Sequence, residues 1–393
     1  MNALDGIRVL DLSRMVAGAM AGMLLADFGA DVVKVEQPGK GDPLRQWTTG
    51  GQSLWWKVYG RNKRCITLNL AAEAGRKLLL QMLPKFDVLM ESFLPGTMES
   101  WGLGWNELSA AHPDLVLLRV SGWGRDGPDS ERPGFGSLVE AGSGLAAMTG
   151  EPDRAPILPA APIADMVSGL YAANAIAFAL RHREAHGGPG QVIDVSLFES
   201  IFSVLGPTAA EYRSAGKVRG RSGSRSTNSA PRGCYATSDG RWIAVSGSTP
   251  KMAQRFLSSY GLGELLQDSR FATNEARVQH ATELDDAIGN AIRVRTLAEN
   301  LQIIRDNGLT ACPVQSIADI DTDPHWQALN LLVDVADGAA NVRMHNAIPR
   351  LSATPGEIRW CGAALGEHNE AIYCNELGLS ARQLAEFRAA GVI

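Results

Sequence analysis

The chain has 393 residues, of which 45% are hydrophobic and 20% charged, and its formal net charge is −5 at pH 7. This composition is typical of globular proteins with one large or two smaller domains, and it argues against a basic nucleic-acid-binding surface. Apolar runs such as Ala172–Leu180 are shorter than a membrane span, and the residues after Met1 lead into a strand pattern without the shape of a signal peptide, so we expect a cytoplasmic protein that binds neither nucleic acid nor membrane.

Strand and helix patterns alternate through the first half of the chain. Ile7–Leu12 and Asp31–Val35 have the composition of strands and flank an apolar helix over Ala17–Phe28. A strand, a helix and a strand within about 30 residues predict a parallel pair with a right-handed crossover. The same alternation continues with strands over Cys65–Leu70, Asp87–Glu91 and Leu115–Val120 and a helix over Ala72–Leu83. These patterns predict an α/β fold with a Rossmann-like large domain and a mostly parallel sheet.

The composition changes in the second half of the chain. Lys217–Arg232 is rich in Gly, Ser and Arg without apolar periodicity, which predicts a mobile loop. A hairpin over Cys234–Ser246 and three helices follow, over Gln254–Tyr260, His280–Ile292 and Thr296–Asp306. We expect the large domain to begin with residues 1–224, a smaller α/β domain over 225–320, and a C-terminal part, 321–393, that returns to the large domain.

A lone carboxylate, Asp165, stands at the predicted start of a long apolar helix within Ala161–Gly169. An aspartate at a helix start is most often a capping residue. The positive end of a helix also stabilises an ionised carboxylate by about 0.3–1 kcal/mol, and the ordinary aspartate pKa of about 3.9 keeps it ionised at neutral pH. Such a group can attack a thioester, so capping and nucleophilic roles are both open.

Other patterns favour structural roles. Gly18 and Gly22 follow the first strand, but the segment lacks G-x-G-x-x-G, which favours tight packing over dinucleotide binding. His182 and His186 lie one helical turn apart at a polar helix end. The five cysteines are widely spaced without a Cys-x-x-Cys pair. We therefore expect no metal site and no disulfide framework.

Segments along nearly the whole chain carry a resemblance to a known family. They are Leu4–Leu12, Leu25–Glu36, Gly41–Pro43, Arg61–Leu68, Asp87–Pro95, Ala161–Gly169, Gly190–Ser200, Asn307–Val314 and Gly391–Ile393. In this order they resemble the class III CoA-transferases of the formyl-CoA transferase and CaiB–BaiF type. The resemblance implies an acyl-CoA:carboxylate CoA-transferase in which Asp165 forms an aspartyl mixed anhydride and an aspartyl-CoA thioester. It further implies an interlocked homodimer, coenzyme A and acyl-CoA as substrates, a carboxylic acid acceptor and no tightly bound cofactor.

The resemblance also implies a CoA-binding edge on the N-terminal sheet. Carried over by position, its lining is Val16, Ala17, Gln37, Leu68, Asn69, Ser92, Phe93, Leu94, Gly134, Phe135, Gly136 and Ser137. Relatives often have basic residues at the positions of Gln37 and Phe93. Five basic residues nearby could take the place of these cations: Lys40, Arg45, Arg61, Lys63 and Arg64. The alternative is that each is a solvated surface charge.

The arginines of the Lys217–Arg232 loop suggest an acceptor site. Arginine binds carboxylates with two parallel hydrogen bonds, so one of these side chains is a candidate to hold an acidic acceptor; a plain solvated loop is the alternative. The candidates are Arg221, Arg225 and Arg232, with Arg219 beside them.

Two other functions remain as alternatives. An α-methylacyl-CoA racemase of this fold needs a histidine near Pro133–Gly136, where this chain has Phe135 and no histidine between His112 and His182. A non-catalytic CoA-binding protein is the second alternative, and the intact segment around Asp165 argues against it.

Overall fold

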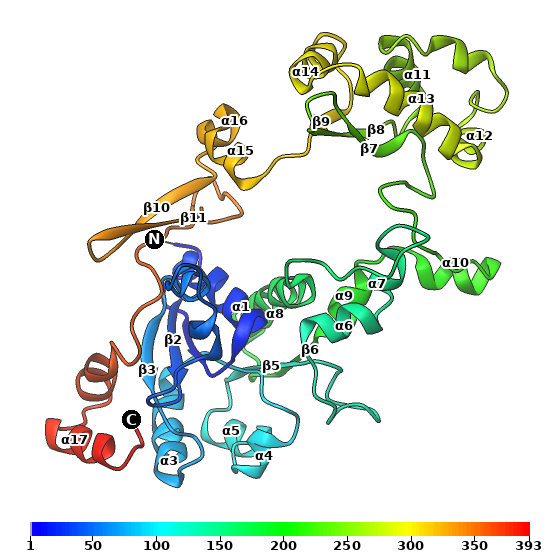
Figure 1. Ribbon diagram of the computed structural model, residues 1–393. Coiled ribbons are helices and arrows are strands. Elements are labelled where there is room, and N and C mark those ends of the chain that lie inside the picture. Colours follow the sequence, from blue (N-terminus) through cyan, green and yellow to red (C-terminus); the bar gives the residue numbers. More distant parts are fainter. Residues whose placement is uncertain (1) are drawn as a thin grey trace. The chain divides into compact units, whose positions relative to one another are not determined.

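Six strands form one parallel sheet in the larger of two units of the computed structural model, which describes residues 2–393 (Figure 1). The strands are β1 (Arg8–Asp11), β2 (Asp31–Glu36), β3 (Arg64–Thr67), β4 (Val88–Glu91), β5 (Val116–Ser121) and β6 (Val192–Ser196). Their order is β3-β2-β1-β4-β5-β6, and each neighbouring pair is parallel. This order confirms the predicted α/β fold, and it reverses direction between β1 and β4, where doubly wound sheets bind their ligands.

Helices cover both faces of this sheet because side chains alternate along each strand. Leu10 of β1 belongs to one buried cluster and its neighbour Val9 to the other. The Leu10 face is covered by α3 (Glu73–Met82), α4 (Thr97–Ser100), α5 (Trp105–Ala111), η4 (Ala371–Glu376) and α17 (Ala381–Ala389). The Val9 face is covered by α1 (Met15–Asp27), α6 (Gly136–Gly142), α8 (Ile163–His186) and α9 (Leu197–Ser203). Shorter elements of this unit are η1 (Pro43–Gln46), α2 (Leu54–Tyr59) and η2 (Leu83–Lys85).

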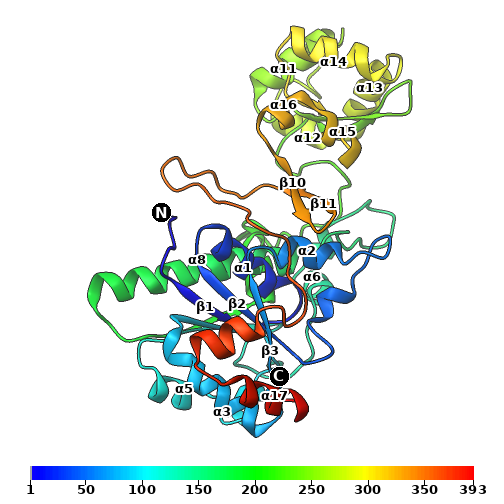
Figure 2. The ribbon, with the colours of Figure 1, turned by 90° about the vertical axis from the view of Figure 1, so that its left-hand side faces the viewer.

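Helix α8 carries the Asp165 segment and lies along α1 (Figures 1 and 2). A Cβ at Gly169 would lie 2.8 Å from the backbone oxygen of Ala17, so glycine permits this close approach. By length and composition α8 could cross a membrane, because an 18-residue window has a mean hydropathy of 1.5. Core helices have the same properties, and α8 contributes Ala172, Ile176 and Leu180 to the buried cluster on the Val9 face.

The segment 328–393 also belongs to this unit. It begins with an antiparallel hairpin of β10 (Leu332–Asp337) and β11 (Ala340–His345). Further on, the carboxylate of Glu376 pairs with Arg8 and Arg64, and the backbone N–H of Asn69 donates to Val392. The C-terminal residues therefore lie against β3 and α3 and help to close the core on that face (Figure 2).

The second unit comprises residues 146–158 and 207–327. Its elements are α10 (Thr208–Ala215), β7 (Arg232–Ala236), β8 (Trp242–Ser246), α11 (Pro250–Ser259), η3 (Gly263–Gln267), α12 (Asn274–Gln279), α13 (Ala281–Arg293), α14 (Leu297–Asp306), β9 (Ala311–Pro313) and α15 (Ile317–Thr322). Helices α7 (Leu145–Met148) and α16 (Pro324–Ala328) span the boundaries between the residues of the two units. The strands form an antiparallel sheet in the order β7-β8-β9 over a separate core that includes Ile243, Phe256 and Ile288.

The boundaries of the second unit differ from the predicted 225 and 320. The loop before β7 belongs to this unit because it bonds to residues 146–158: the backbone N–H of Gly223 donates to Gly150, and Arg221 donates to the backbone oxygen of Glu151. These contacts join segments about 70 residues apart, which local composition does not reveal.

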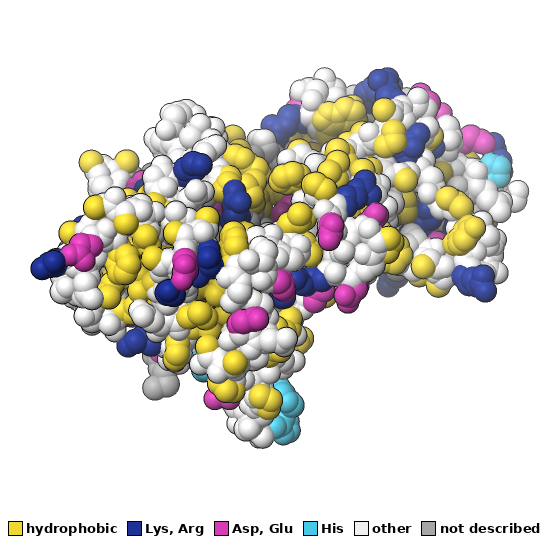
Figure 3. All heavy atoms as spheres, turned by 90° about the horizontal axis from the view of Figure 1, so that it is seen from below, with side chains coloured by type: hydrophobic (Ala, Val, Ile, Leu, Met, Phe, Trp, Pro, Cys, Tyr) yellow, Lys and Arg dark blue, Asp and Glu magenta, His cyan; other side chains and the backbone are white. Residues whose placement is uncertain are grey.

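Both basic and acidic side chains are scattered among hydrophobic ones on the face shown in Figure 3. No single sign of charge dominates that face.

Candidate active site

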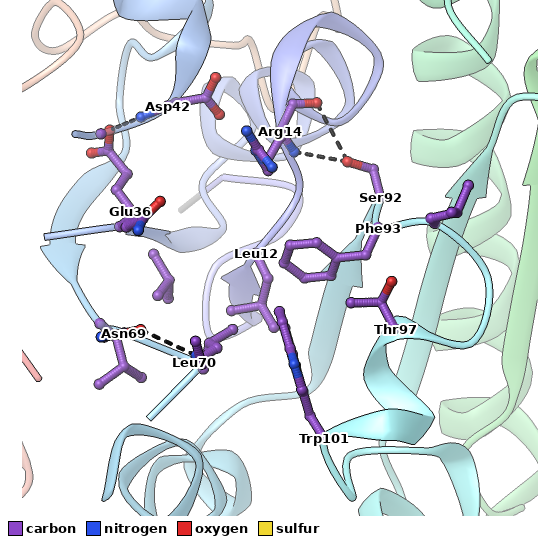
Figure 4. A pocket seen from close by; sticks show the side chains of 16 residues that line it. Leu12, Arg14, Glu36, Asp42, Asn69, Leu70, Ser92, Phe93, Thr97 and Trp101 are labelled. Atoms are coloured by element: carbon purple, nitrogen blue, oxygen red, sulfur yellow. Dashed lines mark hydrogen bonds between the residues drawn. The ribbon is translucent and has the colours of Figure 1, made fainter. Parts of the chain in front are cut away.

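Two neighbouring cavities lie at the carboxyl ends of the strands, on either side of the point where the strand order reverses. The first has a volume of about 470 Å³ and is shown in Figure 4. It is lined by Leu12, Arg14, Val35, Glu36, Gln37, Gly41, Asp42, Leu68, Asn69, Leu70, Ala71, Ser92, Phe93, Leu94, Thr97 and Trp101. Most of these residues lie at or just beyond the carboxyl ends of β1, β2, β3 and β4, which is where open α/β sheets bind ligands.

The second cavity has a volume of about 510 Å³ and contains Asp165. It is lined by Arg14, Met15, Ala17, Pro43, Ser92, Phe93, Leu94, Pro95, Val120, Ser121, Gly122, Ser130, Arg132, Pro133, Gly134, Phe135, Asp165 and Leu197. Arg14 and Ser92–Leu94 line both cavities. A long ligand that spans the two would therefore pass these residues.

The loop between β1 and α1 separates the two cavities and is held by buried charges. The backbone N–H of Arg14 donates to the Ser92 hydroxyl at 2.8 Å (Figure 4). The backbone N–H of Met15 donates to the Asp42 carboxylate at 3.2 Å. Met15 has a φ of +64°, a left-handed conformation that non-glycine residues adopt only when their surroundings hold them. The Lys34 ammonium, itself buried, lies 3.2 Å from Asp42 and fixes that carboxylate. The loop is thus rigidly placed at the junction.

Four of the five basic residues expected near the CoA edge form internal ion pairs. Arg61 is fully buried against Asp27, and Lys63 against Asp11. Arg45 donates two hydrogen bonds to Glu36, and Arg64 pairs with Asp31 and Glu376. The remaining one, Lys40, is exposed. Gly22, for which we predicted a packing role, lies against the buried Lys63–Asp11 pair, since a Cβ there would be 2.8 Å from the Lys63 nitrogen.

Asp165 is the third residue of α8, and it is not the capping residue. The N-cap position is Pro162, which makes no side-chain capping bond. Burial, together with the nearby Glu140 carboxylate, raises the pKa of Asp165 to about 6, and a bond from its own backbone N–H only partly opposes this rise. The sequence-based expectation of an ordinary aspartate pKa is therefore corrected: burial and a like charge outweigh the helix terminus. At neutral pH the group is still mostly ionised.

Glu140 and Gly136, both on α6, shape the surroundings of Asp165. Glu140 is 2% exposed and accepts a hydrogen bond of 3.0 Å from the backbone N–H of Ala164, the residue before Asp165. A Cβ at Gly136 would collide with Oδ2 of Asp165. Glycine at position 136 therefore provides the space that the carboxylate occupies, and Glu140 holds the first turn of α8. Gly136 was predicted to line the CoA site, whereas nothing in the sequence pointed to a role for Glu140.

The structure brings most of the predicted CoA-binding residues together around the two cavities. Gln37, Leu68 and Asn69 line the first, Ala17, Gly134 and Phe135 line the second, and Ser92, Phe93 and Leu94 line both. Val16 is buried in a separate apolar cluster, Gly136 is buried behind Asp165, and Ser137 is exposed on α6. The role of these residues in CoA binding remains a prediction.

The predicted acceptor arginines lie in the second unit and are engaged there. Arg225 pairs with Asp285 at 2.6 Å and donates to Thr282, and Arg221 donates to the backbone of Glu151 and Pro152. Arg219 forms two hydrogen bonds with Glu211, and Arg232 is an exposed residue of β7. Their role with an acceptor also remains a prediction.

The cations that do line the Asp165 cavity, Arg14 and Arg132, were not predicted from the sequence. The available signal was position: Arg14 follows the first strand, and Arg132 stands two residues before the Gly134–Gly136 segment.

Among residues 2–393 no three His, Cys, Asp or Glu side chains are grouped so that they could hold a metal ion. The described residues that line the two cavities include no histidine, and Phe135, which stands where a racemase base is expected, lines the Asp165 cavity. The described residues lining the Asp165 cavity thus offer one carboxylate, that of Asp165, and no opposite histidine.

Comparison with known proteins gives a consistent result. A family model described as CoA-transferase family III matches residues 4–369. A Chloroflexus aurantiacus protein named succinyl-CoA–D-citramalate CoA-transferase is 41% identical over 99% of this chain and 98% of its own length. The β subunit of succinyl-CoA–L-malate CoA-transferase from the same organism is 39% identical, with the same coverage. A crystal structure of a CaiB/BaiF family protein from Brucella suis superposes with a TM-score of 0.85 at 32% identity, covering 95% of this chain and 100% of that one.

Proposed function

The chain belongs to CoA-transferase family III, and we propose that it moves coenzyme A from an acyl-CoA thioester to a carboxylic acid, with Asp165 as the nucleophile. The observation that carries this proposal is the environment of Asp165. Its carboxylate lines a cavity of about 510 Å³, and no positive charge contributes to its pKa. An ionised carboxylate that is not neutralised by a cation retains its nucleophilicity.

The reaction proceeds by acyl exchange on this carboxylate. An Asp165 oxygen attacks the thioester carbonyl carbon and the C–S bond breaks. The CoA thiolate is released, and Asp165 and the donor acyl group form a mixed anhydride. The thiolate then attacks the aspartyl carbon of the anhydride, which releases the donor acid and leaves an aspartyl-CoA thioester. The acceptor carboxylate attacks this thioester and forms a second anhydride. The returning thiolate attacks the acceptor's acyl carbon, so that the new acyl-CoA leaves and the Asp165 carboxylate is restored.

The two neighbouring cavities, which share Arg14 and Ser92–Leu94, suit this order of steps. Coenzyme A would occupy the first cavity and pass Arg14 and Ser92–Leu94, with its sulfur near Asp165 in the second. A thiolate held in this way would stay close to the anhydride while the two acids exchange. The raised pKa of Asp165 makes its ionised carboxylate more basic, which favours attack on the thioester carbonyl, while the group stays mostly ionised at neutral pH.

The donor and acceptor we propose are succinyl-CoA and a second dicarboxylic acid. The support is the naming of the relatives, which pair succinyl-CoA with citramalate, malate or glutarate. We also propose a homodimer, because α8 exposes Leu170, Tyr171 and Phe178, and exposed apolar surface of this kind commonly marks an interface. A cytoplasmic location remains part of the proposal.

Intact-protein mass spectrometry tests the proposal. The enzyme is mixed with a panel of acyl-CoA esters and trapped with hydroxylamine or borohydride, alongside Asp165→Ala. We expect a modification that maps to Asp165 and is absent from the variant. A modification elsewhere, or exchange of the α-proton with solvent deuterium without any adduct, would contradict the proposal and favour racemase chemistry.

A further inference from the structure

The charges that line the Asp165 cavity are few. Asp165 itself is one, and the guanidinium groups of Arg14 and Arg132 are the others among the described lining residues. An acid that binds beside the Asp165 carboxylate brings a second negative charge into this space. One of these two arginines is therefore the group available to balance it.

Arg132 is held by its planar face while its hydrogen-bond donors stay available. The guanidinium lies over the Trp123 ring, 4.4 Å from the ring centre. Trp123 is itself fixed by a hydrogen bond of 3.2 Å from its indole nitrogen to the backbone oxygen of Pro133, and it lies beside Phe198. Stacking on an aromatic ring leaves the edge of a guanidinium free, where its N–H groups point.

The ion pair that Arg132 already makes is weak. Its partner Asp129 lies 3.5 Å away, and the two side chains are 54% and 63% exposed. Exposed pairs of this kind contribute little and exchange readily with another carboxylate. A ligand carboxylate would replace Asp129 at small cost and could form two parallel hydrogen bonds.

Arg132 also lies close to the reacting group along the chain. It precedes Gly136 by four residues, so their Cα atoms are at most about 14 Å apart. A Cβ at Gly136 would touch Asp165, and a Cβ at Gly134 would lie 3.1 Å from the Trp123 indole nitrogen. The segment Arg132–Gly136 thus runs from the guanidinium to the carboxylate along one wall of the cavity.

We propose that Arg132 binds the distal carboxylate of both the acyl donor and the acceptor, and thereby makes the enzyme selective for dicarboxylic acids. This inference rests on the proposed function, in which the two acids react in turn at the same Asp165. Because they occupy the same place, one anchor serves both. The selected substrates are acids with a second carboxylate a few carbons from the first.

Arg14 is assigned to a different part of the substrate. It lines both cavities, and its backbone is fixed by Ser92 at their junction. A group at this junction faces the part of an acyl-CoA that is common to all its esters. Arg14 therefore contributes to affinity for coenzyme A without distinguishing one acyl group from another.

Matched substrates separate these roles. Succinyl-CoA and butyryl-CoA share a four-carbon chain and differ in the distal carboxylate, and glutarate and pentanoate form the corresponding pair of acceptors. The wild type, Arg132→Gln, Arg14→Gln and the surface control Arg382→Gln on α17 are compared by kcat/KM for each pair. Calorimetry with the same CoA esters on an Asp165→Asn background gives dissociation constants that do not depend on turnover.

We expect Arg132→Gln to lower kcat/KM for succinyl-CoA by about 10- to 100-fold and to leave butyryl-CoA within about twofold, as the loss of a charged hydrogen-bonded pair predicts. Arg14→Gln should weaken both esters equally, and Arg382→Gln neither. Equal losses for both esters in Arg132→Gln, or selectivity that disappears in Arg14→Gln instead, would overturn the assignment. If the wild type shows no transfer with any ester, the proposed function fails, while the calorimetric ratio of the two esters still decides the role of Arg132.

Discussion

The cations of the Arg45–Arg64 segment and the charges around Asp165 have opposite surroundings. Arg61, Lys63 and Arg45 pair with carboxylates at 2.6 to 3.1 Å, so these charges stabilise the fold. The charge that raises the pKa of Asp165 is another carboxylate, Glu140, and the cations of the cavity are only weakly paired or exposed. The position of a charged residue in the sequence therefore does not reveal whether it stabilises the fold or serves the site, whereas its ion-pair partners do.

The largest effect is expected from removing the Asp165 carboxylate. Asp165→Asn should lower CoA transfer by about 10⁴-fold or more, because the amide cannot form an anhydride. Steady-state transfer between two CoA esters measures the loss. Retention of more than a few per cent of the activity would exclude Asp165 as the nucleophile.

The same variant should gain stability at neutral pH. The folded pKa of about 6 lies above the ordinary value of 3.8, so the ionised form is disfavoured on folding, and stability present below pH 3.8 is lost as the pH rises through 6. Asparagine avoids this loss, which amounts to about 3 kcal/mol for a shift of about two pKa units. Urea unfolding at pH 8 and at pH 4 should show the gain only at pH 8.

On the structural side, breaking one buried ion pair should cost stability without changing the site. Arg61→Met leaves the Asp27 carboxylate buried without its cation and should lower the free energy of unfolding by about 3–5 kcal/mol. Arg382→Met, which removes an exposed pair with Glu386 on α17, is the control and should have little effect. Equal urea midpoints for the two variants would show that buried pairing does not stabilise this unit.

A smaller effect is expected when the space beside the Asp165 carboxylate is filled by a methyl group. Gly136→Ala places a methyl group where Oδ2 of Asp165 lies, so the carboxylate must move. We expect kcat to fall by about 10²-fold, as for other small displacements of reacting groups. Gly263→Ala in η3 is the control, because its φ is not positive and a Cβ there would make only ordinary contacts, 3.6 Å from the Ser258 hydroxyl. An unchanged kcat in Gly136→Ala would mean that the carboxylate reacts from another position.

The mildest change concerns Glu140. Glu140→Gln keeps an acceptor for the Ala164 N–H but removes the like charge, so the pKa of Asp165 should fall. The acidic limb of the kcat/KM profile is expected near pH 6 in the wild type and should move to lower pH in this variant. It should not reach the ordinary aspartate pKa, because burial, the larger cause of the raised pKa, remains. Glu107→Gln, exposed on α5, should leave the profile in place. A limb that does not move would assign the whole shift to burial.

Much of the fold follows from local pattern. The alternation of strands and helices predicted the parallel sheet, and the glycine and apolar spacing placed Asp165 within the first turn of its helix. Glu140 could not be found in this way, since it acts on a residue 25 positions away through an N–H that only the packing of α6 on α8 brings near.

The basic residues illustrate the other limit of sequence reasoning. Arg61 and Lys63 stand in a polar stretch that suggests solvent exposure, but the partners that bury them, Asp27 and Asp11, lie on α1 and β1. Whether a charge is paired depends on such distant contacts. For the same reason the arginine-rich loop attracted attention, whereas Arg132 did not.

The return of residues 328–393 to the first unit has a consequence for how the chain is made. All six strands of the sheet are synthesised by Ser196, but η4 and α17, which cover its Leu10 face, follow only from Ala371 onward. Roughly 175 residues must be added in between, which takes roughly 10 to 35 s at about 5–20 residues per second. During translation the nascent sheet therefore leaves the ribosome with part of one apolar face uncovered, at a stage when the core of the second unit can already close.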